Sequence, residues 1–462
     1  MLIKKTHKFL KYKFNGVPIV MALLSVLVVM YPELCYPQNG QDEDIEVVDI
    51  SKDVITITEG LNIATQSSRI INIASHNVDI ADTESELAMA ALRPSVDANI
   101  GHTSLYNQPG ALFNNNKVNT ANKNSLFFGI TVKHIIYDFG VNSYRYNESL
   151  VAIDKTKLDV HRVKNIIALN YLLACYELLE TDRLIYVALR EVEQLKAHRD
   201  VTQTLFNEGV ITRNDFLAAN VKLADANQRL LSLKNLRTLN ASRINYFLTR
   251  PLMGEVTLVD NLPQPPVLAG LEVYWKLAQS QRMEVKMADK QIEILQIESK
   301  MKMATYYPKF FIQGGFNYTE NRYLVHEGNW SVAIGADLNI FNGGATKSEV
   351  SKIKHKIAQQ SEERKKIIDD IKLEVEKSYL DTKTALEKLK VTQAAIAQGH
   401  ENLRINKARY EEGQGTATDI LDAIALLAQA ESNYYRALFE LKRSYATLLY
   451  ATATDVVLEY KR

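Results

Sequence analysis

Histidine has the widest chemical range of the side chains in this sequence, because it can act as an acid, a base or a metal ligand. The nine histidines are scattered along the chain, and none shows the clustered spacing of a metal site. The sequence also contains no Gly-rich phosphate loop and no Ser nucleophile elbow. We therefore expect a protein that is not an enzyme and that holds no cofactor or metal.

Aspartates stand at matching places in two similar stretches of the chain. Residues 206–219 read Phe-Asn-Glu-Gly-Val-Ile-Thr-Arg-Asn-Asp-Phe-Leu-Ala-Ala, and residues 410–423 read Tyr-Glu-Glu-Gly-Gln-Gly-Thr-Ala-Thr-Asp-Ile-Leu-Asp-Ala. Asp419 and Asp422 are three residues apart, so both can point to one face of a helix. Alternatively, Asp419 only caps that helix and Asp422 is solvated.

Each of these stretches has the pattern of a turn between two helices. Gly209 and Gly413 can take the left-handed conformation that ends a helix, and the Thr or Asp that follows can cap the next one. Helical periodicity extends over about 141–206 and 213–249, and again over about 346–410 and 417–451. Apolar residues of the last stretch alternate at spacings of three and four, as in coiled coils. We predict two long helical hairpins that arise from an internal duplication.

Four further stretches have the period of two that is typical of strands, and each has one apolar and one polar face. They cover about 95–106, 125–138, 308–318 and 330–341. Pro94 and Pro308 end the helices that precede them, because a residue before proline avoids the helical conformation. The Asn-rich residues 107–123 are expected to form a loop.

The predicted strands suit a membrane barrel, although an ordinary sheet packed on a core is the alternative. They are about ten residues long, apolar on one face and flanked by aromatic residues. A closed membrane barrel needs about eight strands, and an open edge in lipid leaves backbone groups unpaired. If these strands span a membrane, several copies of the chain must therefore share one barrel, of about eight strands for two copies or about twelve for three.

The N-terminus has the features of an export signal. Five lysines precede the apolar stretch Val17–Met30, which is too short for a comfortable membrane span. We expect cleavage between Leu34 and Gln38. Cys35 suits a lipoprotein, but Leu34 stands where a small residue is expected, so export without lipid is the simpler interpretation.

The whole-chain composition excludes several classes of protein. The 462 residues have a formal charge of +1, which gives no indication of a nucleic-acid partner. A hydrophobic content of 46% does not describe a multi-span helical membrane protein. The two cysteines, Cys35 and Cys175, are too few and too far apart for a disulfide framework, and we expect Cys175 to be buried.

The sequence resembles the TolC-like outer-membrane efflux proteins over about residues 58–454. The resemblance rests on the two Gly-centred turns, on Pro94 and Pro308, and on the strand ends Tyr137-Asp-Phe-Gly140 and Phe341-Asn-Gly-Gly344. It implies a mainly α fold with a membrane β-barrel portion. Three chains with four strands each would share a 12-stranded barrel in the outer membrane of a Gram-negative bacterium, in contact with its lipid. The duplicated hairpins would form an α-barrel in the periplasm.

The resemblance also implies a function and partners. The homotrimer would be the exit duct of a tripartite efflux or export system, which passively conducts substrates delivered by a periplasmic adaptor and an inner-membrane pump or ABC exporter. The tips that meet the adaptor in the family correspond to Gly209, Val210, Gly413 and Gln414. A partner for type I protein secretion is an alternative within the family. An exported coiled-coil structural or adhesive protein is an alternative of another class.

In the family, aspartates that follow the second tip form rings at the narrowest point of the entrance. Asp419 and Asp422 match those positions, so the resemblance implies stacked acidic rings, a common device for cation preference in a pore.

The family entrance is held shut by a tyrosine and an arginine of the second hairpin, which bond to an aspartate of the first. Tyr410 and Asp215 match the tyrosine and the aspartate, but Gly415 occupies the arginine position. Either the neighbouring Arg213 replaces that arginine, or the adaptor contributes more of the closure. On this interpretation, Tyr410→Phe or Asp215→Ala would raise the conductance of the closed channel.

These interpretations divide the chain as follows: signal peptide 1–37; flexible segment 38–57; first repeat 58–250, with strands in 95–138 and a hairpin over 141–249; connector 251–270; second repeat 271–454, with strands in 308–341 and a hairpin over 345–451; tail 455–462.

Overall fold

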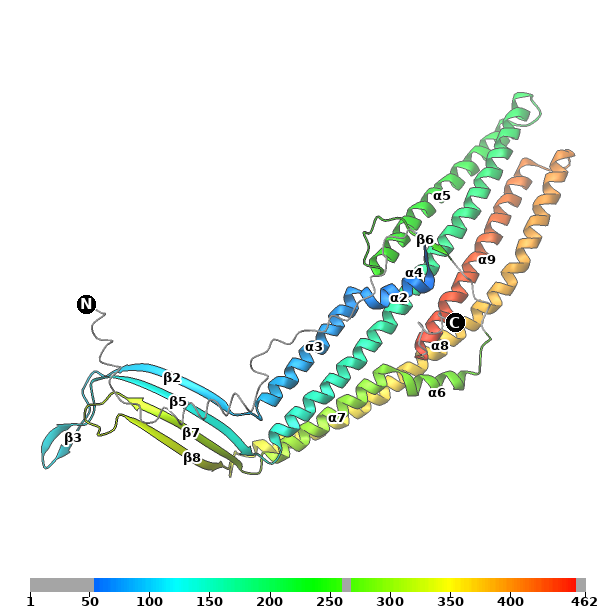
Figure 1. Ribbon diagram of the computed structural model, residues 1–462. Coiled ribbons are helices and arrows are strands. Elements are labelled where there is room, and N and C mark those ends of the chain that lie inside the picture. Colours follow the sequence, from blue (N-terminus) through cyan, green and yellow to red (C-terminus); the bar gives the residue numbers. More distant parts are fainter. Residues whose placement is uncertain (1–53, 260–266, 454–462) are drawn as a thin grey trace, which may run out of the picture. The chain divides into compact units, whose positions relative to one another are not determined.

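A computed structural model describes residues 54–259 and 267–453 (Figure 1). The predicted signal peptide, Cys35, most of the segment 38–57 and the tail 455–462 lie outside the described residues.

The helices of the two halves have the same lengths in the same order. The first half contains α2 (Ile57–Ser67), α3 (Arg69–Ala90), α4 (Val141–Asn207) and α5 (Arg213–Phe247), of 11, 22, 67 and 35 residues. The second half contains α6 (Leu271–Gln281), α7 (Met283–Ala304), α8 (Ala345–Glu411) and α9 (Ala417–Ala451), again of 11, 22, 67 and 35 residues. A helix of 67 residues is on the order of 100 Å long. The predicted long helices therefore begin and end within two residues of the observed ones.

The long helices α4 and α8 each continue past two shorter helices. Helices α3 and α5 pack along successive parts of α4, and α7 and α9 pack along successive parts of α8. Because α4 also packs against both α7 and α9, the helices form a layer of four at each level. The order is α3-α4-α7-α8 nearer the strands and α5-α4-α9-α8 nearer the hairpin turns (Figure 1). Helix α8 is thus one edge of both layers, whereas α3 and α5 form the other.

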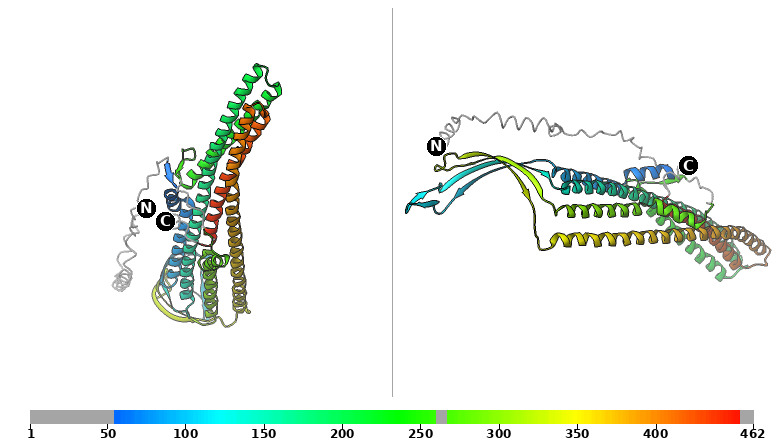
Figure 2. Two further views of the ribbon diagram at one scale, coloured as in Figure 1. Left: turned by 90° about the vertical axis from the view of Figure 1, so that its right-hand side faces the viewer. Right: turned by 90° about the horizontal axis from the view of Figure 1, so that it is seen from below.

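Four antiparallel strands form a sheet at the end of the long helices away from the hairpin turns (Figure 2). Their order is β2 (Ser95–Ser104), β5 (Asn124–Tyr137), β7 (Lys309–Thr319) and β8 (Gly328–Asp337). The register places the predicted apolar faces on the same side, since Ala98 pairs with Ile130, Ile130 with Phe316 and Phe316 with Trp330. The side chains of β2 and β8 on this face are largely exposed, as expected of a surface that meets lipid.

The opposite face of the sheet is mainly polar, although it also carries Phe127 and Phe311. One row across the strands consists of Asn99, Gly129, Asn317 and Asn329. Gly129 has to be small, because a Cβ there would lie 2.3 Å from Oδ1 of Asn99 and 2.7 Å from Oδ1 of Asn317. The two carboxamides therefore lean together over the glycine.

The strand-to-helix connections depend on glycine at both ends of the duplication. Gly140 and Gly344, with φ of +94° and +85°, are the N-caps of α4 and α8. Asp138 supports the first connection, because its carboxylate accepts hydrogen bonds from the backbone N–H of Gly140 (3.1 Å) and of Asn142 (2.9 Å).

Two sequence predictions need correction. Residues 107–123 are not only a loop, because they contain a hairpin of β3 (Gly110–Phe113) and β4 (Asn116–Asn119). Asn114 and Asn115 form its turn at φ of +48° and +66°, a conformation that Asn tolerates better than most residues. The flexible segment 38–57 ends earlier than predicted, since β1 (Val54–Thr56) pairs in parallel with β6 (Thr257–Val259) of the connector.

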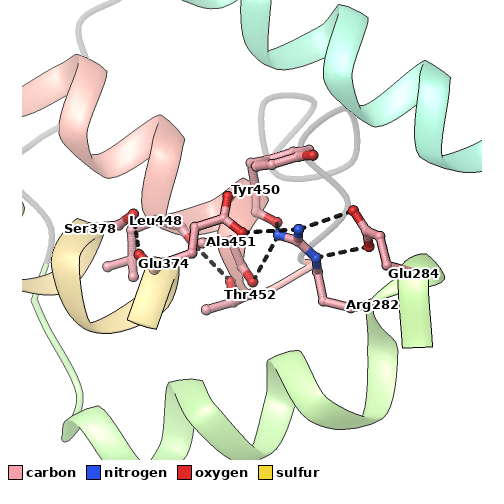
Figure 3. A network of polar contacts seen from close by, with 8 residues as sticks. All are labelled: Arg282, Glu284, Glu374, Ser378, Leu448, Tyr450, Ala451 and Thr452. Atoms are coloured by element: carbon pink, nitrogen blue, oxygen red, sulfur yellow. Dashed lines mark hydrogen bonds and ion pairs between the residues drawn. The ribbon is translucent and has the colours of Figure 1, made fainter. Parts of the chain in front are cut away.

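A network around Arg282 joins three helices of the second half (Figure 3). The guanidinium, at the start of α7, donates to both carboxylate oxygens of Glu284 at 3.0 Å and forms an ion pair with Glu374 of α8 at 3.0 Å. It also donates to the carbonyls of Tyr450 (3.5 Å) and Ala451 (3.4 Å) at the end of α9. Each of the three nitrogens of this buried guanidinium therefore has an acceptor.

Within residues 54–259 and 267–453, no helix combines the length and the apolar character needed to cross a membrane.

Candidate functional site at the hairpin tips

Both hairpin tips have the same backbone geometry. Gly209 and Gly413 have φ of +78° and +73°. The N–H groups of Val210 and Gln414 donate back to the carbonyls of Leu205 (2.9 Å) and Arg409 (2.8 Å), which completes the helix end. Apart from the adjacent residues, no described atom lies within 4 Å of a Cβ placed at either glycine, so the conformation rather than the space requires glycine there. The side chain of Val210 is two-thirds exposed at the first tip.

The two aspartates that follow the tips belong to capping boxes, in which Thr212 and Thr416 are the N-caps and Asp215 and Asp419 are the N3 residues. The carboxylate of Asp215 accepts from the N–H (3.2 Å) and the hydroxyl (2.6 Å) of Thr212. The carboxylate of Asp419 accepts from the N–H of Thr416 at 2.8 Å. Hydrogen bonds from Thr416, assisted by the charge of Arg409, lower the pKa of Asp419. Both carboxylates are therefore engaged within their own turns.

Asp419 and Asp422 share the side of α9 that faces away from its core. Asp419 is half-buried and Asp422 is exposed, whereas Ile420, Leu421 and Ile424 are buried. The predicted pair of acidic groups on one face is compatible with this arrangement, and capping by Asp419 does not prevent it.

Tyr410 does not bond to Asp215 within the chain. Its hydroxyl is buried and has no hydrogen-bond partner among the described residues. Burial, and secondarily the negative charge of Asp215, raises the pKa of Tyr410. The ring instead meets the imidazole of His198 on α4, with centroids 5.7 Å apart and an interplanar angle of 65°. The structure thus places Tyr410 against a histidine of the first hairpin.

Gly415 lies in a tight turn. A Cβ there would be 3.1 Å from the backbone N of Tyr410 and 3.3 Å from the carbonyl carbon of Arg409, so a larger residue requires a backbone adjustment. Arg213 is exposed and forms no ion pair within the described part of the chain. The cation at the second tip is Arg409, whose guanidinium donates to the carbonyl of Gln414 at 3.3 Å.

His198 and Arg409 are the tip residues that the sequence analysis missed. A signal for His198 was present, because Glu191, Leu195, His198 and Thr202 are spaced by four, three and four residues and all four are buried. A signal for Arg409 was its position next to Tyr410. No group of His, Cys, Asp and Glu side chains that could hold a metal occurs among the described residues.

The comparisons with known proteins agree with this fold. The family model "Outer membrane efflux protein" matches residues 60–247 and 275–454. A search of curated proteins gave no match. Among solved structures, the outer-membrane channel OprN has a TM-score of 0.74 at 15% identity, over 87% of this chain and 90% of that one. The Campylobacter jejuni outer membrane channel CmeC has a TM-score of 0.74 at 13% identity, over 88% of each chain. The outer membrane protein VceC from Vibrio cholerae has a TM-score of 0.72 at 13% identity, over 86% of this chain and 96% of that one.

The family match covers most of both halves of the duplication, whereas the structural similarities establish the fold, with its α-barrel and β-barrel portions. The predicted resemblance and fold class are confirmed, and the exported structural or adhesive protein is excluded. The chain belongs to the outer membrane efflux protein family, and it is an outer-membrane channel that extends into the periplasm and not an enzyme.

Proposed function

We propose that three copies of this chain form the passive exit duct of a tripartite efflux system. A periplasmic adaptor and an inner-membrane pump or ABC exporter deliver the substrate to the duct. The observation that carries this proposal is that the edges of the described fold stay open: the outer strands of the sheet pair on one side only, and the edge helices carry exposed apolar residues.

The edges of the sheet require further copies of the chain. Strands β2 and β8 are the outer strands of the described sheet, and an unpaired strand edge is not tolerated in lipid. If β8 of one copy pairs with β2 of the next, three copies give 3 × 4 = 12 strands. That number leaves room for a lumen, whereas about eight strands are filled by their own side chains.

The edges of the helix layers carry exposed apolar residues. On α3, Ile73, Ile80 and Leu87 form an exposed stripe next to Ala74, Ala81 and Ala88, which are buried against the chain. Exposed apolar residues also occur on the other two edge helices: Leu217, Val221, Leu231 and Leu239 on α5, and Leu373, Leu380 and Val391 on α8. The two edges of one chain differ, so the contact between neighbouring copies joins unlike surfaces. Contacts of this kind produce a closed ring when the rotations between successive copies add up to a full turn.

The hairpin tips form the periplasmic entrance in this proposal. Asp419 and Asp422 of three chains surround the opening as acidic rings, and Tyr410 and Asp215 belong to the gate. Gly209, Val210, Gly413 and Gln414 meet the adaptor, for which the exposed Val210 offers an apolar contact. An inner-membrane partner that exports proteins would use the same tips, so the substrate is decided by that partner.

The experiment tests assembly and conduction separately. The full-length protein, extracted from outer membranes in detergent, is expected to have the mass of three chains by light scattering and to form channels in planar bilayers. The double variant Ile73→Glu with Ile80→Glu is expected to shift the mass to one chain, whereas Ser75→Glu, at an exposed polar position of the same helix, should leave three. A wild-type protein that is monomeric, or that conducts no ions, would refute the proposal.

A further inference from the structure

The contact between the two hairpins near their tips contains two buried polar atoms that lack a partner. The side chain of His198 is 7% exposed. Its Nε2 and the hydroxyl of Tyr410 have no hydrogen-bond partner within the described ranges. Buried polar groups are nearly always hydrogen-bonded, so two exceptions whose rings touch call for an explanation. Tyr410 packs against a hydrophobic cluster that includes Leu195 of α4, Leu403 of α8 and residues of α9.

Among the described residues of the second hairpin, the groups that act on the charge of His198 include no carboxylate. Helix α8 contributes Tyr410 and the like charge of Lys407, and α9 contributes the backbone of Ala417. The carboxylate of Asp419 is held by Thr416 in the cap of α9. An imidazolium in this place would face a lysine and no free carboxylate.

Three carboxylates of the described first hairpin are held by other partners. On α4, Glu191 pairs with Arg229 at 2.5 Å, and Asp200 pairs with Arg199 at 2.8 Å. On α5, the carboxylate of Asp215 is held by Thr212, as described above. The contact between the hairpins therefore accommodates the neutral imidazole and disfavours its protonated form, because burying an unpaired charge is costly.

We propose that His198 is a positioning residue of the closed entrance, whose neutral ring packs against Tyr410 and whose protonation separates the two hairpins. This inference rests on the proposed function, since it assigns a pH response to the same entrance. Acidification of the periplasm opens the tips, and no change in the adaptor is needed.

The direction of the pH response follows from the surroundings of the His198 ring. Burial lowers the pKa of His198 below the ordinary value of 6.5, Lys407 lowers it further, and the backbone of Ala417 opposes both. Above pH 6.5 the ring is neutral whether the tips are together or apart. Below it, only the exposed histidine of separated tips takes up a proton, so the closed state loses up to about tenfold in population per pH unit and per chain. Below the lowered pKa of the packed ring, both states bind the proton and the population of the closed state falls no further.

The experiment measures tip separation without relying on conduction. Spin labels at Val210→Cys and Gln414→Cys of the full-length protein report the distance between the two tips of a chain. From about pH 8 to about pH 5, the range in which histidine titrates, this distance is expected to lengthen. The conductance of the closed channel in bilayers should rise over the same range.

Variants assign the response to one ring. His198→Gln and His198→Leu cannot titrate and should abolish the pH dependence of both readouts, and the two together guard against a variant that does not fold. His355→Gln removes an exposed histidine of α8 and should leave the response intact. A pH-independent distance in the wild type, or a response that survives both His198 variants, would overturn the inference. If the distance responds to pH while the protein conducts no ions, the proposed function fails, and only the pH-dependent separation of the two hairpins remains.

Discussion

The network around Arg282 and the ring pair His198–Tyr410 both join helices that are distant in sequence, but they differ in how completely their polar groups are satisfied. Arg282 has two carboxylates and two backbone carbonyls as partners. The ring pair leaves Nε2 and a hydroxyl unbonded among the described residues. A fully paired buried charge resists separation, whereas an unsatisfied contact loses little when it opens. The comparison suggests a permanent junction in the middle of the chain and a releasable one at the tips.

The largest effect is expected from breaking the permanent junction. Arg282→Met leaves the carboxylates of Glu284 and Glu374 without their cation. We expect a loss of about 3 kcal/mol in the free energy of unfolding, the lower end of the range for buried pairs, because Glu374 is partly exposed. Unfolding by denaturant in detergent measures the free energy of unfolding of the variant and of the wild type.

The matched control is Lys366→Met, which breaks an exposed pair with Asp370 on α8. It should leave the free energy of unfolding nearly unchanged, as is usual for surface ion pairs within a helix. Equal losses in the two variants would show that the Arg282 network is no stronger than a surface contact.

A smaller effect is expected at the turn of the second tip. Gly413→Val places a β-branched residue at a φ of +73°, which costs about 1–2 kcal/mol, with no steric clash to add to it. Faster hydrogen exchange of residues near the tip should report this cost, together with weaker capture of the periplasmic adaptor and a loss of global stability no larger than the cost itself. Gly413→Asn is the control, since Asn tolerates this conformation. Slow exchange at the tip of the valine variant would contradict the prediction.

The smallest effect is expected from Tyr410→Phe. The hydroxyl has no partner within the described chain, so its removal should leave the closed-state conductance unchanged or slightly lower. A tyrosine hydroxyl bonded to an aspartate would give the opposite result, a rise in conductance, as the family resemblance implies. The conductance of the variant in planar bilayers at neutral pH distinguishes an unbonded hydroxyl from one that is bonded to an aspartate. The same measurement on Asp215→Asn tests whether the aspartate takes part.

The sequence predicted the elements well wherever a local signal marks their ends. Pro94 and Pro308 end helices, Gly140 and Gly344 begin them, and Gly413 ends α8 near the predicted position. Each of these residues restricts or permits backbone conformations by itself, so no knowledge of the fold is needed.

The interior of the candidate site was less accessible to sequence reasoning. The contact of His198 with Tyr410 joins residues more than two hundred positions apart, and the alignment of the two hairpins decides it. The network of Arg282 likewise depends on where α9 ends against α7 and α8. The hairpin in 107–123 was missed because an Asn-rich composition is shared by loops and by tight turns.

The equal lengths of the helices in the two halves constrain how the gene can change. If three chains place six tips around one opening, those tips end in one plane only when both hairpins reach equally far. Lengthening α4 and α5 by two turns each would raise three of the six tips by about 11 Å, so the tips around the opening would alternate between two heights. A partner protein with a flat binding surface could not contact all six tips. An insertion in one hairpin should therefore be tolerated only together with an insertion of equal length in the other hairpin.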